Sequence, residues 1–318
     1  MKRAFTRFSL WQFNIGHRFV IGVPYIWLLI FFALPFLILL RISVTNMAGG
    51  TDPFAPLLER AAGAWHLLLR FDSYSSIVLE AEQGTAGAFG NTIYVEAYRV
   101  SLKYAALTTL FCLLIGYPFA YFIARSRASI RPALLMLVML PFWTSFLLRI
   151  YAWKEILADE GVLNNLLLAI GVIREPIVML YTDFSMLVGM TYVYCPFMIL
   201  PLYANLVKMN TSLLEAAHDL GASAWKAFWL ITVPLSKSGI IAGSMLVFIP
   251  CVGEFVIPSL LGGAENIMIG RVVSDEMFVS NNWPRACALS TVVILLILVP
   301  LAWYYRSKSE NNNNLGID

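Results

Sequence analysis

Residues 104–123 read YAALTTLFCLLIGYPFAYFI, a run that contains no charged side chain. A transmembrane helix needs about 20 predominantly apolar residues, because the hydrocarbon core of a bilayer is about 30 Å thick. A helix also satisfies its own backbone hydrogen bonds, which lipid cannot do for it. This stretch therefore predicts a membrane-spanning helix and favours an all-α integral membrane fold.

Five other stretches have the same length and character, so we expect six transmembrane helices. The other five are residues 19–40, 133–153, 184–207, 239–261 and 286–305. A shorter apolar run, residues 162–173, contains two asparagines. We expect that run to lie in the membrane interface or to re-enter the membrane rather than to cross it.

The composition agrees with a lipid environment. Hydrophobic residues make up 59% of the chain and charged residues 13%, whereas an ordinary globular chain is about 45–50% apolar and about 25% charged. A net charge of +3 on so apolar a chain cannot neutralise a phosphate backbone. These figures exclude a cytosolic enzyme, a disordered protein and a nucleic-acid-binding protein.

The distribution of basic residues predicts the orientation. The N-terminal segment 1–18 is rich in Lys and Arg, and the short segment between the second and third stretches carries Arg125, Arg127 and Arg131. Short cytoplasmic loops carry an excess of Lys and Arg, so we expect both termini in the cytoplasm. The first apolar run is too long for the roughly 7–15-residue core of a cleavable signal peptide, and we expect it to remain as an anchor.

The rest of the chain divides around one transmembrane domain, residues 19–305. Residues 42–103 form the longest outer segment, in which the spacing of apolar residues predicts an amphipathic helix over residues 56–71. Residues 208–238 form the longest cytoplasmic loop. The tail, residues 306–318, has a polar composition with the run Asn311–Asn314 and is expected to be disordered.

The loop 208–238 has the pattern of two short helices. Thr211 or Ser212 is expected to cap the first helix, and Glu215, three residues beyond Ser212, has the spacing of a capping box. Gly221 is suited to the left-handed conformation that ends many helices. A second helix is expected from residue 222 to 231, and Pro234 is expected to end it. The sequence thus predicts a helix–turn–helix in the cytoplasm.

The same loop carries a spaced motif. Its positions are Glu215, Ala216, Ala217, Gly221, Ile231, Val233 and Pro234. This spacing resembles the E-A-A-x3-G-x9-I-x-L-P signature of inner-membrane permease subunits of ATP-binding-cassette importers, with Val233 in place of the usual Leu. The resemblance implies a type I importer permease of the MetI-like fold, in which these residues and Asp219 contact an ATPase subunit.

That resemblance also implies partners and a location. The chain would pair with a second homologous permease in the bacterial inner membrane. Two copies of a cytoplasmic ATPase would bind ATP and Mg²⁺, and a periplasmic binding protein would deliver the substrate. The chain itself contains no Gly-x4-Gly-Lys-Ser/Thr phosphate-binding loop. We expect no catalytic group, metal site or cofactor on it.

The runs WTSFLLRIYAW at residues 143–153 and GEFVIP at residues 253–258 resemble the spermidine/putrescine branch of these permeases. The resemblance implies a polyamine as the substrate, with putrescine expected first and spermidine or another small organic cation as the alternative.

Five residues are candidates for the substrate pathway. Glu254 is an acid within an apolar stretch, where exposure to lipid would cost at least about 2.5 kcal/mol; it either contacts the cation or pairs with a polar group and holds helices together. Aromatic rings attract cations, but they also line membrane interfaces. The aromatic candidates are Trp143, Tyr151, Tyr192 and Tyr194.

Two other classes of function remain as alternatives. An ion-coupled secondary carrier would work without an ATPase, but such carriers often contain inverted repeats, which this sequence does not show convincingly. A membrane-embedded enzyme would need clustered His, Asp or Glu within the spans. Neither alternative explains the spacing of the motif that begins at Glu215.

Overall fold

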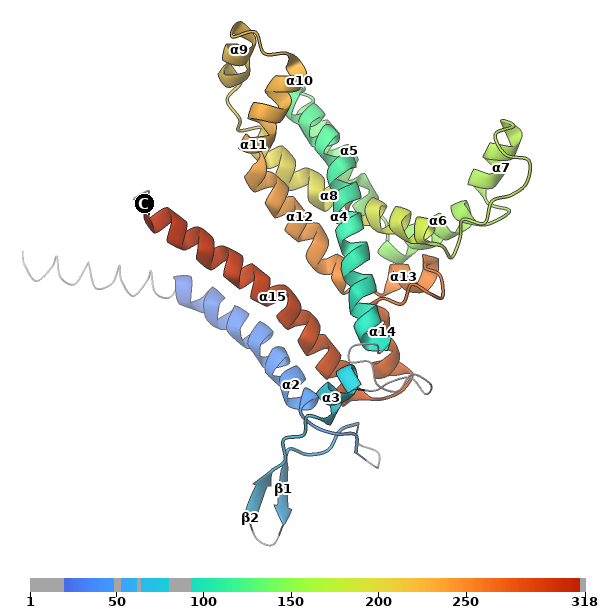
Figure 1. Ribbon diagram of the computed structural model, residues 1–318, viewed down its shortest axis with the longest axis vertical. Coiled ribbons are helices and arrows are strands. Elements are labelled where there is room, and N and C mark those ends of the chain that lie inside the picture. Colours follow the sequence, from blue (N-terminus) through green and yellow to red (C-terminus); the bar gives the residue numbers. More distant parts are fainter. Residues whose placement is uncertain (1–19, 49–52, 62–63, 80–92, 315–318) are drawn as a thin grey trace, which may run out of the picture. The chain divides into compact units, whose positions relative to one another are not determined.

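The structure, a computed structural model, describes residues 20–48, 53–61, 64–79 and 93–314. The expected N-terminal segment 1–18 lies outside these residues. The chain forms two compact units: Met1–Ile77 together with Glu276–Asp318, and Val78–Asp275. Figure 1 shows the elements of both units, coloured along the sequence.

The first unit contains two long apolar helices. Residues Val20–Ser43 form a helix that includes a π-helical turn, Leu29–Ala33, and ends with α2, Leu34–Ser43. It packs beside α15, Trp283–Asn314 (Figure 1). The first and last expected spans are therefore helical. Because α15 continues to Asn314, the expectation of a disordered tail is wrong for residues 306–314.

The outer segment differs from its expected structure. Instead of an amphipathic helix over residues 56–71, it contains the antiparallel strands β1, Leu58–Ala61, and β2, Ala64–Leu67, which pair from Leu58↔Leu67 to Ala61↔Ala64. A short helix, α3, follows at Asp72–Leu79. A short helix and a two-stranded hairpin are each marginal by themselves, so the spacing of the apolar residues does not decide between them.

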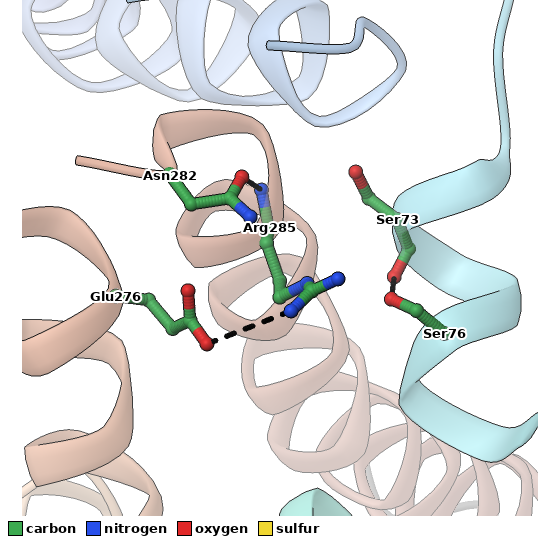
Figure 2. A network of polar contacts seen from close by, with 5 residues as sticks. All are labelled: Ser73, Ser76, Glu276, Asn282 and Arg285. Carbon is green, nitrogen blue, oxygen red and sulfur yellow. Dashed lines mark hydrogen bonds and ion pairs between the residues drawn. The ribbon is translucent and has the colours of Figure 1, made fainter. Parts of the chain in front are cut away.

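Polar contacts organise the start of α15, as Figure 2 shows. The Asn282 side-chain oxygen accepts a hydrogen bond from the Arg285 backbone N–H at 3.2 Å, the usual arrangement of an N-cap. The Arg285 guanidinium lies 3.9 Å from the Glu276 carboxylate. In α3, the Ser76 hydroxyl donates to the Ser73 carbonyl. The Asn282 cap marks where the last helix begins.

The core of the second unit is a group of three helices. They are α4, Ile93–Arg125, α8, Asp183–Leu206, and α12, Lys237–Val252, each in contact with the other two. Glycines on α12 allow it to approach α8 closely. A Cβ atom on Gly243 would lie 2.7 Å from the Met198 sulfur, and one on Gly239 would lie 2.8 Å from the Asn205 Cβ. Membrane helices associate through such small residues, since lipid supplies no hydrophobic driving force between them.

The third and fifth expected spans are broken. Residues 133–153 fall on α5, Arg131–Met139, a 3₁₀ turn, Leu140–Trp143, and α6, Phe146–Leu157. The chain bends by 86° between Trp143 and Phe146, where Thr144 and Ser145 have extended backbone. Residues 239–261 fall on α12 and a separate short helix, α13, Val256–Leu261. Neither stretch is one straight helix.

Among the described residues, three helices are long and apolar enough to cross a membrane, or up to five if each bent pair counts as one span. A further apolar helix, Trp283–Leu298, is shorter. The run at residues 162–173 contains α7, Val162–Ala169, which follows α6. α14, Ile269–Phe278, carries the chain from the second unit back to the first.

Candidate functional site

The loop between α8 and α12 is a helical hairpin, which lies at one end of the three-helix group in Figure 1. Its first helix, α9, is Ser212–Asp219. Gly221 follows with φ +80°, and the backbone N–H groups of Gly221 and Ala222 donate to the carbonyls of His218 and Ala217. These two bonds form a Schellman motif. The expected first helix and its glycine turn are confirmed.

The second half of the hairpin is less regular than expected. It consists of α10, Ala224–Ala227, a π-helical turn, Phe228–Thr232, and α11, Val233–Leu235. These elements form one helical run, Ala224–Leu235, which ends one residue after Pro234, so the expectation that Pro234 ends the second helix is confirmed. α12 follows at Lys237 after a 65° bend.

The capping box expected between Ser212 and Glu215 does not form. Thr211 occupies the N-cap position of α9, and its side chain makes no capping bond. The Asn210 side-chain oxygen instead accepts from the Ser212 backbone N–H at 3.0 Å. At the second helix, the Ser223 hydroxyl accepts from the Lys226 N–H. Glu215 is consequently free of a capping role and is exposed.

The hairpin presents an uncovered surface. Ala217 is buried and Ile231 is half-buried, whereas Glu215, Ala216, Asp219 and Pro234 are exposed. The hairpin also exposes large apolar side chains: Leu220 is 89% exposed and Leu230 is 73% exposed, with Trp225 at 70%. Clustered apolar exposure marks a surface that contacts another protein or a membrane.

Glu254 lies in the break between α12 and α13 and is 8% exposed. One carboxylate oxygen accepts the backbone N–H groups of Phe255, Val256 and Ile257 at 3.0–3.4 Å. The other accepts the Tyr194 hydroxyl from α8 at 2.5 Å. The carboxylate thus caps the N-terminus of α13, where the helix dipole favours a negative charge, and ties it to α8.

The other aromatic candidates do not join this pair. Trp143 is 76% exposed, and Tyr151 is exposed on α6. Tyr192, two residues before Tyr194 on α8, contacts Trp153 edge-on at 5.4 Å. Both rings line an apolar cavity of about 750 Å³ between α4, α5, α6 and α8. No acidic side chain is among the residues that line this cavity, so its chemistry does not fit a dication.

Two features of the structure were not predicted from the sequence, and the first is Arg149. The Arg149 guanidinium lies over the rings of Phe142 and Phe146, and its Nε and Nη1 are buried without a hydrogen-bond partner among the described residues. The rule that selected Glu254, an ionisable group within an apolar stretch, would also have selected Arg149.

The second missed feature is a polar cluster at the start of α8. The Asn266 amide donates to Asp183 and accepts from the Tyr104 hydroxyl at 2.8 Å. Its members lie far apart in the sequence, and nothing in their local pattern indicates the contact.

Most of the chain is similar to known proteins. Residues 112–308 match the family described as "Binding-protein-dependent transport system inner membrane component". The chain is 34% identical over 305 residues to the spermidine/putrescine transport system permease protein PotB of Haemophilus influenzae, covering 96% of this chain and 98% of that protein. It is 40% identical over 226 residues to the PotB of Escherichia coli, covering 71% and 82%.

The fold is also similar to a solved structure. A chain in the crystal structure of a bacterial alginate ABC transporter in complex with an alginate pentasaccharide-bound periplasmic protein superposes with a TM-score of 0.65. The similarity covers 92% of this chain and 95% of that chain, at 18% sequence identity. The expected importer-permease fold is therefore confirmed.

Proposed function

Because the chain belongs to the family of binding-protein-dependent transport system inner membrane components and to its PotB group, we propose that it forms part of the membrane pathway of an ATP-driven polyamine importer. The chain is a multi-pass inner-membrane transport subunit. The observation that carries the proposal is the α9–α11 hairpin, whose exposed acidic and apolar side chains lie at one end of the helices in a family that works with separate partner proteins.

In this proposal the hairpin inserts into a cleft of a cytoplasmic ATPase. ATP and Mg²⁺ are held by two copies of that ATPase, a second homologous permease completes the pathway, and a periplasmic protein delivers the substrate. ATP binding draws the hairpins together and opens the pathway outward, and hydrolysis reverses the change. The chain binds and moves its substrate without covalent chemistry.

We propose putrescine or spermidine as the substrate. The two relatives are named for both polyamines, and the choice of putrescine as the first candidate comes from the sequence resemblance. The exposed rings of Trp143 and Tyr151 are suited to contact ammonium groups, since cation–π contacts contribute roughly 0.5–2 kcal/mol each. The uptake assay therefore measures both amines.

The test is reconstitution of this chain with the second permease, the ATPase and the binding protein in lipid vesicles. Uptake of labelled putrescine and spermidine should require ATP and should vanish when the phosphate-binding lysine of the ATPase is replaced. A proton gradient alone should drive no uptake. Uptake that persists without the ATPase and follows the proton gradient would identify a secondary carrier instead.

Gly221 provides a direct test of the hairpin. A Cβ at this position meets nothing within 4 Å, but φ is +80°, a conformation that costs a non-glycine residue about 1–2 kcal/mol. We expect Gly221→Val to reduce ATP-driven uptake strongly. Gly221→Asn should retain it, because Asn tolerates the left-handed region. Equal uptake by wild type and Gly221→Val would show that the turn is not needed for coupling.

A further inference from the structure

Phe228 is the centre of a cluster of aromatic rings at the base of the hairpin. Its ring lies edge-on to Tyr117 and Tyr121 of α4, with centroids 5.5 Å and 5.9 Å away. On the hairpin itself it contacts Trp225 at 6.1 Å and Trp229 at 5.4 Å. Edge-on pairs at these distances contribute about 0.5–1.5 kcal/mol each beyond the area that they bury. Phe228 therefore fastens the hairpin to α4.

This contact matters because of how the hairpin is joined to the three-helix core. α8 leads into the hairpin and α12 leads out of it, so both receive its movement through the chain. α4 has no such connection. Besides the ring contacts, the Tyr117 hydroxyl shares a hydrogen bond with the Ser236 hydroxyl, 2.8 Å away, just before α12. Side chains of the Phe228–Ser236 segment thus link the hairpin to α4.

The backbone at Phe228 is also unusual. Phe228 opens the π-helical turn Phe228–Thr232, and the Thr232 hydroxyl in that turn is buried without a hydrogen-bond partner among the described residues. π-helical turns are rare and occur frequently at functional sites. An irregular turn therefore lies at the point where the hairpin meets α4.

α4 reaches the opposite end of the second unit. It contains 33 residues, which corresponds to about 50 Å at 1.5 Å per residue. Near its other end, the Ser101 hydroxyl accepts the Ile269 backbone N–H at 2.8 Å and the Tyr104 hydroxyl donates to the Asn266 side chain at 2.8 Å. One continuous helix, with Pro118 inside it, thus contacts both the hairpin and the segment that leads into α14.

We propose that Phe228 transmits the movement of the ATPase-bound hairpin to α4, and that α4 carries it to the Asn266–Ile269 segment. This inference rests on the proposed function. Phe228 acts as a positioning residue, because it moves another element and does not contact the substrate. Its loss should leave the ATPase bound and active while separating ATP hydrolysis from import.

The experiment uses the complete reconstituted transporter and measures polyamine molecules imported per ATP hydrolysed. Phe228→Leu keeps an apolar side chain but removes the ring; we expect the ratio to fall about fivefold or more, the size of a typical coupling between sites. Phe228→Tyr keeps the ring and should restore the ratio. Trp229→Leu is the matched control, since Trp229 is on the same hairpin, is 51% exposed and contacts Phe228.

Three results would overturn the inference. An unchanged ratio in Phe228→Leu would show that α4 needs no ring contact, and ATP-driven uptake by the wild type would still support the proposed function. Loss of the ATPase from purified Phe228→Leu complexes would make Phe228 a docking residue. An equal fall in Trp229→Leu would assign the effect to the hairpin surface. Absence of ATP-driven uptake in the wild-type complex would instead contradict the proposed function, and with it this inference.

Discussion

At the scale of the residue, Glu254 shows how a buried charge is accommodated within a membrane protein. Its carboxylate accepts three backbone N–H groups and one hydroxyl, so both oxygens are occupied within the chain. The charge also lies at a helix N-terminus, which favours an anion. These bonds support the second of the two expected roles, in which Glu254 holds helices together.

Replacement of Glu254 separates the two roles. Glu254→Ala leaves the α13 N–H groups without an acceptor, and each buried unsatisfied group costs about 1–3 kcal/mol. We expect a clear drop in the thermal unfolding temperature of the purified complex. Tyr194→Phe removes one bond and should have a smaller effect. Normal thermal stability of Glu254→Ala with loss of uptake would instead assign the carboxylate to the substrate.

At the scale of the element, the contact between α8 and α12 depends on glycine. A Cβ on Gly243 would approach the Met198 sulfur to 2.7 Å and its carbonyl oxygen to 3.2 Å. The sulfur is at the end of a flexible side chain, but the carbonyl belongs to the α8 backbone and cannot move by itself. A larger residue must therefore separate the two helices.

We expect Gly243→Val to lower the yield of folded protein and its thermal stability, since overpacking typically costs about 1–3 kcal/mol. Gly22→Val is the matched control: Gly22 also lies in an apolar helix, but a Cβ there meets nothing within 4 Å. Size-exclusion profiles and thermal unfolding in detergent measure the difference. Equal behaviour of the two variants would show that α8 and α12 tolerate separation.

At the scale of the whole molecule, the chain exposes more apolar surface than a protein surrounded by water normally does. The apolar helix Val20–Ser43 has no buried residue in its most apolar window. Such a surface requires lipid or another membrane subunit. The orientation in that membrane follows from the Lys- and Arg-rich short segments, which predict that the hairpin and both termini are cytoplasmic.

Cysteine labelling tests this orientation. Ser212 on α9 and Asp159 between α6 and α7 are both exposed. We expect a membrane-impermeant maleimide to label Asp159→Cys in spheroplasts and to label Ser212→Cys only after the membrane is opened. The unsubstituted chain, in which three of the four native cysteines are buried, gives the background. The reverse pattern would place the hairpin outside and remove its contact with an ATPase.

The sequence by itself determined the membrane class, the positions of the main helices and the glycine turn of the hairpin. These features depend on local composition and spacing: a lipid-embedded run must satisfy its own backbone, and Gly221 ends α9 wherever that helix packs. The outer hairpin β1–β2 and the break in the third stretch were not predicted, because strand pairing and that break depend on neighbours that a periodic pattern does not contain.

Only the tertiary structure decided which side chains meet. Tyr194 and Glu254 are 60 positions apart, and Tyr117 and Ser236 are 119 apart. Their contacts depend on the rotation of each helix about its axis, which the apolar runs leave open because such runs are apolar on every side. The rotation of α8 about its axis decides that Tyr192 lines the apolar cavity and that Tyr194 contacts Glu254.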